Sequence, residues 1–313
     1  MQLITAEVPD SPARTAQPTR DPLVVGLVQT RWRADPDVHA KVLADGIRTA
    51  ADAGASVVCL PELTLSRYPA DTKPGADAAA TAEDLESGAT YTFAAKAAAD
   101  AGVAVHASLF ERADGPDGLG YNTAILVAPD GTLLGRTRKL HIPVSAGYYE
   151  DHYFRGGPAG SDAYPVVELP TPGAPARFGL PTCWDQWFPE AARAYSLAGA
   201  EVIVYPTAIG SEPDHPDFDT EPLWRQVIVG NGIANGTFMV VPNRWGDEGV
   251  LTFYGSSFIS DPYGRVLVAA PRDDDAVLVA PLDLDQRRDW LTLFPFFETR
   301  RPDTYGGLTH GNR

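Results

Sequence analysis

The chain has 313 residues, of which 44% are hydrophobic, and this is enough apolar material for one large core or two smaller ones. Its formal net charge of -16 argues against a nucleic-acid partner, because phosphate binding needs clustered Lys and Arg. The two cysteines are too few for a disulfide framework, which favours a reducing, cytoplasmic location.

The first 21 residues are polar and include three prolines. They lack the apolar core of a signal peptide and are too polar to span a membrane. We therefore predict that residues 1–21 form a flexible extension and that the protein has no membrane partner.

Helices and strands alternate in the segment that follows. Residues 23–29 are an apolar run typical of a buried strand, a helical stretch covers 36–53, and a second strand covers 56–60. This alternation predicts an α/β fold. The second strand leads into Glu62, and α/β sheets open their clefts at the carboxyl ends of strands. Glu62 is therefore either an active-site carboxylate or an exposed loop residue, whereas Cys59 is expected to pack in the core.

The middle of the chain adds a lysine and a glutamate to the candidate residues. A loop, a helix and three strands are expected at 64–80, 81–101, 103–110, 121–127 and 132–138. Lys139 follows the last of these strands, where it is either a solvated charge or a functional cation. An aromatic-rich loop then contains Tyr149 and Glu150, and the residue types alone favour no role for it.

Cys183 lies at a predicted corner of the chain. A strand at 177–180 ends just before it, and a helix is expected to begin near Glu190. A cysteine on such a turn projects from the sheet edge beside backbone N–H groups that stabilise negative charge, which is typical of a nucleophile. The alternative is a structural cysteine, since free Cys is among the most buried residue types. Later elements are a strand at 202–205, a helix at 221–235, a strand at 276–281 and a helix at 283–293.

The sequence of residues 183–190, Cys-Trp-Asp-Gln-Trp-Phe-Pro-Glu, resembles the nucleophile segment of the carbon-nitrogen hydrolases of the nitrilase superfamily. It is most similar to the N-carbamoylputrescine amidase branch. The resemblance implies a four-layer α-β-β-α sandwich over residues 22–293. It also implies a homodimer or larger homo-oligomer, in which the aromatic tail at 294–313 is expected to pack at a subunit interface.

The resemblance also implies catalytic roles for individual residues. Cys183 corresponds to the nucleophile and Glu62 to the general base. Lys139 corresponds to the cation that stabilises the oxyanion, together with a backbone N–H of the turn. Glu150 corresponds to a second glutamate that orients the lysine and the substrate.

Several other residues are expected to bind the substrate. Glu212 matches the carboxylate that holds the distal amine of a polyamine in this branch, although a solvated loop carboxylate is an equal alternative from the residues alone. More acidic residues at 214–222 make a preference for cations plausible. Trp184, Trp187 and Tyr149 are expected to contact the substrate.

The implied activity is the hydrolysis of N-carbamoylputrescine, or a similar carbamoyl amine, to putrescine, carbon dioxide and ammonia without a metal or organic cofactor. Alternatives are an enzyme for another small amide or N-carbamoyl amino acid, or an inactive binding protein. Two features depart from the branch. The loop at 64–80 lacks its usual aromatic and glutamine residues, and Leu223 stands where a histidine is usual.

Overall fold

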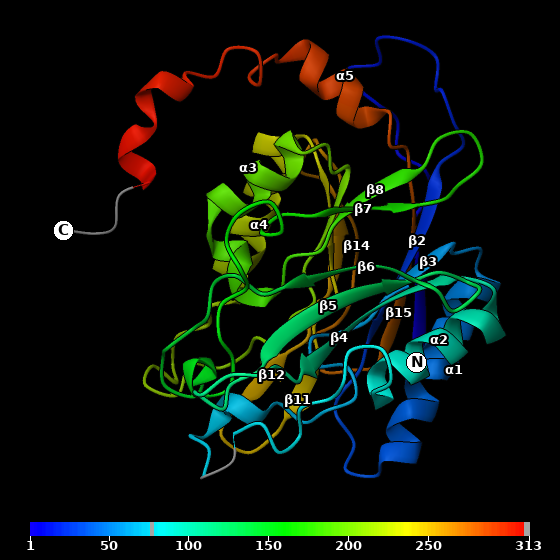
Figure 1. The fold of residues 1–313 in the computed structure, drawn as a ribbon. Helices are drawn as coiled ribbons and strands as arrows, with labels where there is room; N and C mark the ends of the chain where they lie inside the picture. Colours follow the sequence, from blue (N-terminus) through cyan, green and yellow to red (C-terminus); the bar gives the residue numbers. More distant parts are fainter. Residues whose placement is uncertain (76–77, 310–313) are drawn as a thin grey trace.

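The computed structural model describes residues 1–75 and 78–309, which form two β-sheets packed face to face with helices outside them (Figure 1). The first sheet has seven strands in the order β1-β15-β2-β3-β4-β5-β6. In that order they are β1 (Gln2–Thr5), β15 (Ala276–Leu282), β2 (Leu23–Gln29), β3 (Val57–Cys59), β4 (Ala104–Glu111), β5 (Tyr121–Val127) and β6 (Leu133–Arg138).

The second sheet has six strands in the order β14-β13-β10-β9-β8-β7. They are β14 (Val266–Ala269), β13 (Phe258–Ser260), β10 (Phe238–Val241), β9 (Val202–Val204), β8 (Ala176–Gly179) and β7 (Val166–Leu169). A separate ribbon pairs β11 (Trp245–Asp247) with β12 (Thr252–Tyr254).

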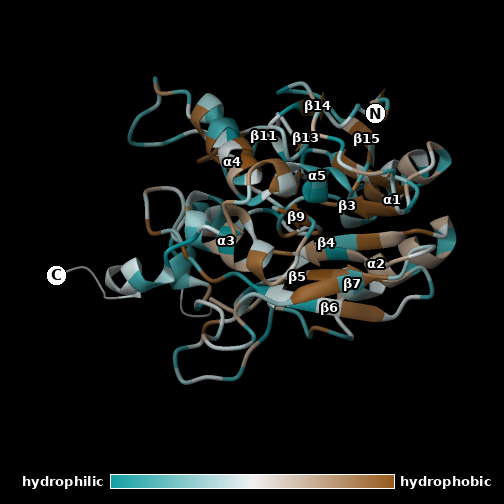
Figure 2. Ribbon diagram, turned by 90° about the horizontal axis from the view of Figure 1, so that it is seen from above, coloured by the Kyte–Doolittle hydropathy of each residue, from teal (hydrophilic) through white to brown (hydrophobic). Residues whose placement is uncertain are grey.

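The main core lies between the two sheets. Leu27 and Cys59 of the first sheet share one buried apolar cluster with Phe178, Val204 and Val240 of the second. Strands β4, β5 and β7 are accordingly rich in hydrophobic residues in Figure 2. Burying each such side chain contributes about 1.5–3 kcal/mol, so this double-sided burial fixes the relative position of the sheets. Cys59 packs in the core as predicted.

Four helices form the outer layers. They are α1 (Pro36–Asp52) and α2 (Ala89–Ala101), which pack on the first sheet, and α3 (Pro189–Leu197) and α4 (Glu221–Asn235), which pack on the second. Figure 1 shows the two pairs on opposite sides of the sandwich. The small residues of α2, such as Ala94 and Ala98, let this helix lie close to the sheet. These layers confirm the predicted α-β-β-α sandwich.

One predicted helix begins later than expected. The stretch 81–101 was expected to be helical throughout, but α2 starts only at Ala89. The side chain of Asp84 accepts hydrogen bonds from the backbone N–H groups of Glu86 and Ser87, which forms a turn, and the backbone of Glu83 pairs with the end of β4. These local hydrogen bonds compete with the helical ones, as is usual for Asp.

The N-terminal segment differs from the flexible extension predicted for residues 1–21. Gln2–Thr5 forms β1, which pairs in parallel with β15 at the edge of the first sheet. Residues 9–20, here called the N-terminal strap, cross the start of α5 (Gln286–Leu293), where Figure 1 shows the segment beside that helix. Polarity suggested a flexible segment, but polar side chains of the strap bond to buried carboxylates, although most of the strap itself is exposed.

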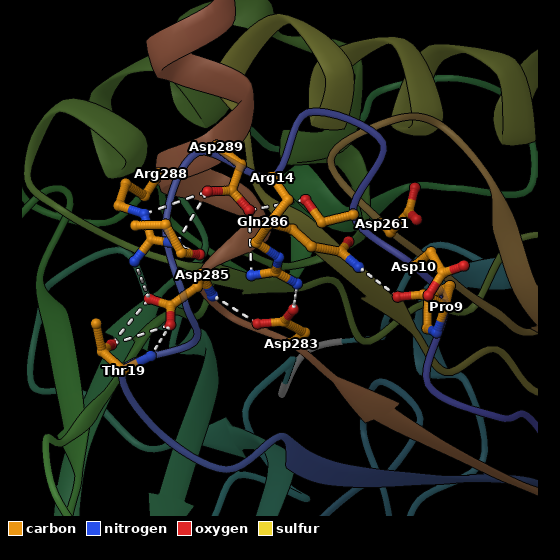
Figure 3. Close-up of polar contacts among 12 residues, drawn as sticks. Pro9, Asp10, Arg14, Thr19, Asp261, Asp283, Asp285, Gln286, Arg288 and Asp289 are labelled. Carbon is orange, nitrogen blue, oxygen red and sulfur yellow. Dashed lines mark hydrogen bonds and ion pairs between the residues drawn. The ribbon is translucent and has the colours of Figure 1, made fainter.

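Three aspartates hold the strap (Figure 3). Arg14 pairs with Asp283 and Asp289, while Thr19 donates its hydroxyl to Asp285 at 3.0 Å. All three aspartate side chains are buried. The side chain of Gln286 also donates to the carbonyl oxygen of Pro9 at 3.0 Å. The predicted helix at 283–293 begins only at Gln286, because Oδ1 of Asp283 accepts a hydrogen bond from the backbone N–H of Asp285 and forms a turn before the helix.

The C-terminal segment runs from α5 across one end of the sandwich (Figure 1). It contains two short 3₁₀ helices, η4 (Pro302–Thr304) and η5 (Gly306–Thr309). Part of its aromatic content contacts its own chain, since Phe296 packs on Trp290 and Arg193 lies over the ring of Phe297. The predicted packing of 294–313 on a second subunit stays a prediction, and residues 310–313 lie outside the described residues.

Candidate active site

The predicted catalytic side chains meet at the carboxyl ends of strands from both sheets. Glu62 follows β3 and Lys139 follows β6, and these two strands run in the same direction. Glu150 opens the 3₁₀ helix η2 (Glu150–His152), and Cys183 opens η3 (Cys183–Trp187) after β8. The sheets therefore bring together residues that are up to 121 positions apart in the sequence.

Lys139 lies between the two glutamates. Its Nζ is 3.0 Å from Oε1 of Glu62 and 2.6 Å from Oε2 of Glu150. All three side chains are inaccessible to solvent or nearly so. Charges are rarely buried unless they are paired, so this arrangement of one cation and two carboxylates is costly and closely constrained.

Both oxygens of the Glu62 carboxylate have further donors. Oε1 also accepts a hydrogen bond from Nδ2 of Asn122 at 2.7 Å, and Oε2 accepts one from the backbone N–H of Ala208 at 2.8 Å. Glu150 is held in turn by the Tyr68 hydroxyl, which donates to its Oε1 at 2.8 Å. The two carboxylates are therefore fixed in orientation as well as in charge environment.

Burial and the neighbouring charges shift the pKa values of Glu150 and Lys139. Burial raises the pKa of Glu150 above its usual range; Lys139 opposes this, while the Glu62 carboxylate adds to the rise. Burial acts to lower the pKa of Lys139, but Glu150 and Glu62 outweigh it and raise that pKa above its ordinary value. Lys139 therefore stays protonated between the carboxylates.

Cys183 occupies a strained turn. Its backbone φ of 39° lies in the left-handed region, which costs a non-glycine residue about 1–3 kcal/mol. A hydrogen bond from the Cys183 N–H to the carbonyl oxygen of Pro206, 3.0 Å long, helps to hold it there. Asp185 also links the turn to the segment after Lys139, because its Oδ1 accepts from Nδ1 of His141 at 2.7 Å.

The thiol of Cys183 needs a base before it can act as a nucleophile. Burial raises its pKa well above the ordinary value; the Glu62 carboxylate adds to the rise, and Lys139 opposes it. The resting group is therefore a protonated thiol, whereas the thiolate is the reactive form. A carboxylate in the same site is the group that could accept the proton during attack.

A cavity of about 340 Å³ opens onto the sulfur. Cys183 and Glu150 line it, while Glu62 and Lys139 are buried behind them. The other lining side chains are mostly apolar, and they include Trp184, Trp187, Ile209 and Leu223. Glu212 also lines the cavity, and burial raises its pKa above the usual range. Among the described residues that line the cavity, there is no Lys or Arg.

Two expectations about substrate-binding residues need correction. Tyr149 does not line the cavity: its ring packs against Lys73 and His152, and the neighbouring Tyr148 lines the cavity instead. The two tyrosines are adjacent in an irregular loop, which has no repeating pattern of inward and outward side chains. The sequence therefore could not show which ring faces the cavity.

The acidic stretch at 214–222 is also mostly separate from the cavity. Asp219 pairs with Arg272, and Glu221 pairs with Arg225 on the first turn of α4. Only Glu212 contributes a loop carboxylate to the cavity lining. The expectation of a cationic substrate therefore rests on Glu212 and not on the carboxylates at 214–222.

Sequence reasoning missed Tyr68 and Asn122. Tyr68 lies in the loop at 64–80, just before the 3₁₀ helix η1 (Pro69–Asp71), where the departure from the related branch had drawn attention only to substrate choice. Asn122 lies in β5, where the sequence shows a polar residue within an apolar run. The structure shows that its side chain is fully buried. Such a residue usually has a specific hydrogen-bond partner, here Glu62.

Two broader properties of the described ranges complete the site. Across residues 1–75 and 78–309, no cluster of three or more His, Cys, Asp or Glu side chains is arranged to hold a metal ion. Within the same ranges, no helix has the length and apolar character needed to cross a membrane.

Comparison with known proteins identifies relatives over nearly the whole chain. Residues 24–291 match the sequence model of the carbon-nitrogen hydrolase family. The N-carbamoylputrescine amidase of Arabidopsis thaliana is 36% identical over 294 residues, covering 91% of this chain and 95% of that protein. The citrullinase of Francisella tularensis is 35% identical over 288 residues, covering 90% and 96%. A carbon-nitrogen hydrolase structure from Helicobacter pylori G27 is 28% identical, with a TM-score of 0.78, and covers 93% of this chain and 99% of that one.

Proposed function

Since this chain belongs to the carbon-nitrogen hydrolase family and is therefore a hydrolase of C–N bonds, we propose that its substrate is N-carbamoylputrescine. The observation that carries the proposal is one apolar cavity that holds the Cys183 sulfur, the Glu150 carboxylate and a single loop carboxylate, Glu212. The substrate combines a neutral ureido group with a distal ammonium ion. The first suits attack by the sulfur, and the second suits Glu212.

Cys183 is the proposed nucleophile. Its sulfur attacks the ureido carbon while Glu62 accepts the thiol proton, a role supported by the raised pKa of the thiol and by the donors that orient Glu62. The carbonyl oxygen becomes an oxyanion, which Lys139 and the backbone N–H of Trp184 stabilise. By precedent, each such donor contributes about 3–4 kcal/mol to stabilisation of the transition state.

The tetrahedral intermediate then collapses. The bond between the carbon and the terminal nitrogen breaks, Glu62 gives its proton to that nitrogen, and ammonia leaves a thiocarbamate on Cys183. Glu62 next takes a proton from a water molecule that attacks this intermediate. The S–C bond breaks, the sulfur is reprotonated, and the released carbamate decomposes to carbon dioxide and putrescine.

The cavity lining favours a cationic substrate over a zwitterionic one. A ureido amino acid carries a carboxylate beside its ammonium group, and burying an unpaired carboxylate is unfavourable. The lining offers it no Lys or Arg partner. A carbamoyl diamine needs only an acceptor for its ammonium, which Glu212 supplies, and a charge-assisted hydrogen bond of this kind is worth about 1.5–3 kcal/mol.

Ammonia release tests the proposal directly. We expect turnover of N-carbamoylputrescine, with kcat/KM at least about tenfold higher than for L-citrulline, N-carbamoyl-β-alanine or butyramide, and no turnover by Cys183→Ala. Glu212→Gln should lower kcat/KM for the carbamoyl diamine about 10- to 100-fold, which corresponds to the strength of one charge-assisted hydrogen bond.

Asp214→Asn is the matched control, because Asp214 is an exposed carboxylate of the same loop that does not line the cavity. It should retain the wild-type kcat/KM. Preferential turnover of L-citrulline would show that the site binds a distal ammonium together with a carboxylate, which would contradict the proposed substrate. Equal losses in Glu212→Gln and Asp214→Asn would contradict the assigned role of Glu212.

A further inference from the structure

Asn243 and Arg244 follow β10, and their side chains are buried although neither lines the cavity of the candidate active site. They lie at the carboxyl end of the strand next to β9, so they reach the same edge of the sandwich as the catalytic residues. The proposed mechanism gives them no task. Arg244 nevertheless donates hydrogen bonds to the segment 62–66, and Asn243 bonds to Ile209, which follows the Ala208 N–H donor to Glu62.

Arg244 forms hydrogen bonds with the main chain at and after Glu62. Its Nη2 donates to the carbonyl oxygens of Glu62 at 2.7 Å, Leu63 at 3.1 Å and Ser66 at 3.1 Å. Leu63 has a φ of 50°, a left-handed conformation that side-chain-bearing residues seldom adopt. The guanidinium therefore helps to hold the chain in this conformation, together with Ser108, whose hydroxyl accepts from the Leu63 N–H at 3.1 Å. A guanidinium is suited to this because it presents several donors in a fixed plane.

The other end of the guanidinium connects to the second glutamate. Nη1 of Arg244 is 2.8 Å from Oε1 of Glu248, and both side chains are only 4% exposed. Oε2 of Glu248 accepts a hydrogen bond from the backbone N–H of Tyr68 at 2.9 Å. The Tyr68 hydroxyl is the donor that holds Glu150. The Arg244–Glu248 pair thus holds the backbone of both segments that orient the two active-site carboxylates.

Asn243 forms two hydrogen bonds with the backbone of Ile209, which lines the cavity. Its Nδ2 donates to the carbonyl oxygen of Ile209 at 3.0 Å, and its Oδ1 accepts from the Ile209 N–H at 3.2 Å. The preceding residue, Ala208, donates its N–H to Oε2 of Glu62. Glu62 is therefore held through its own main chain by Arg244 and, through Ala208, by the segment that Asn243 fixes.

We infer that Asn243 and Arg244, with Glu248, are positioning residues that fix the Glu62 carboxylate for proton transfer from Cys183. The inference rests on the proposed role of Glu62 as the base. Proton transfer depends steeply on the separation and orientation of donor and acceptor, so loosening the Glu62 main chain should slow chemistry. Substrate affinity should change little, because none of the three side chains lines the cavity.

The test compares Arg244→Lys, which keeps the charge but loses the planar fork, with Glu248→Gln, which leaves the arginine in place. For N-carbamoylputrescine we expect kcat to fall at least about tenfold in Arg244→Lys and severalfold in Glu248→Gln, with KM within about threefold of wild type. Arg48→Lys is the matched control, since Arg48 makes an exposed pair on α1, and it should keep the wild-type kcat.

A second readout does not depend on the substrate. The rate at which iodoacetamide alkylates Cys183 reports removal of the thiol proton, and it should fall in the same order in the variants. If the wild type does not hydrolyse N-carbamoylputrescine but Cys183 is still alkylated more slowly in the variants, the proposed substrate is wrong and the positioning role is supported. Folded variants with wild-type kcat and alkylation rates would overturn the inference. Failure of both variants to fold, judged by circular dichroism, would also overturn it in favour of a purely structural role.

Discussion

Two groups of buried carboxylates in this molecule are built in opposite ways. In the candidate active site, Glu62 and Glu150 share one cation, Lys139, so negative groups outnumber positive ones. Under the N-terminal strap, Asp289 accepts hydrogen bonds from Ser11 at 2.8 Å and from the Thr15 hydroxyl at 3.0 Å. It also pairs with Arg14 and Arg288. Glu62 and Glu150 therefore share a single cation, whereas Asp289 alone pairs with two.

One carboxylate of each group, Glu150 and Asp289, has a shifted pKa, and the two shifts have opposite directions. Burial raises the pKa of Glu150. Burial acts on Asp289 in the same sense, but hydrogen bonds from Ser11, Arg288 and Thr15 outweigh it and lower the pKa. A raised carboxyl pKa means that the folded state disfavours the charge, and a lowered one means that it favours the charge. Burial of a carboxylate therefore indicates neither stability nor function until its partners are counted.

Glu150→Gln should separate function from stability most clearly. Activity should fall about 10²- to 10³-fold, because the amide no longer orients Lys139 as a carboxylate does. The free energy of unfolding should change by less than about 1 kcal/mol or should rise, since the remaining Glu62–Lys139 pair is balanced in charge. Ammonia release and urea denaturation measure the two effects, and a large loss of stability would contradict the comparison.

Asp289→Asn should do the reverse. We expect a loss of about 1–3 kcal/mol in unfolding free energy, because Ser11, Arg14 and Thr15 of the strap lose a charged and buried partner. The kcat should stay within about twofold of wild type, since the residue contacts no part of the cavity. Asp303→Asn is the control, as Asp303 forms an exposed pair near the C-terminus, and it should leave stability unchanged.

The contribution of Asp289 to the free energy of unfolding should depend on pH. Because folding lowers the pKa of Asp289, its contribution is fully present above the ordinary Asp pKa and is lost as the pH falls through the lowered value. The stability gap between wild type and Asp289→Asn should therefore be constant near pH 7 and should shrink below about pH 4. Urea denaturation at several pH values measures it, and a gap that widens in acid would reverse the assigned sign.

The smallest expected effect comes from an exposed pair. Lys96 and Asp100 form an i,i+4 ion pair on the surface of α2, where water screens both charges. Lys96→Ala should change the unfolding free energy by no more than about 0.5 kcal/mol. A larger loss would mean that an exposed ion pair stabilises the fold as much as a buried one, which would contradict the role given to burial.

The sequence predicted the elements whose signal is local. Periodicity and strong boundary residues located β2, β5 and α4 with their observed bounds, and the four-layer sandwich followed from resemblance. The convergence of Glu62, Lys139 and Glu150 was also foreseen, although their catalytic roles remain predictions. Glu62 and Lys139 follow strand ends, which are visible as apolar runs in the sequence, whereas Glu150 was singled out only by the resemblance.

Contacts between distant segments were not predictable in this way. Arg244 bonds to carbonyl oxygens about 180 positions earlier in the chain, and a backbone oxygen leaves no trace in residue type. The strap was missed for a related reason. Its Arg14 and Thr19 are ordinary polar residues until the fold brings Asp283 and Asp285 to them. The expected substrate contact of Tyr149 did not anticipate that Tyr148 lines the cavity, because one step along an irregular chain exchanges the inward and outward rings.

The position of β15 has a consequence for how the chain folds. This strand, at residues 276–282, lies between β1 and β2, which belong to the first 29 residues. The first sheet therefore cannot be completed until almost the entire chain has left the ribosome. During synthesis, the edge of β2 that will later pair with β15 is open to other strands. Contacts of such large sequence separation also slow folding, so this sheet should form late and should be the point at which misassembly begins.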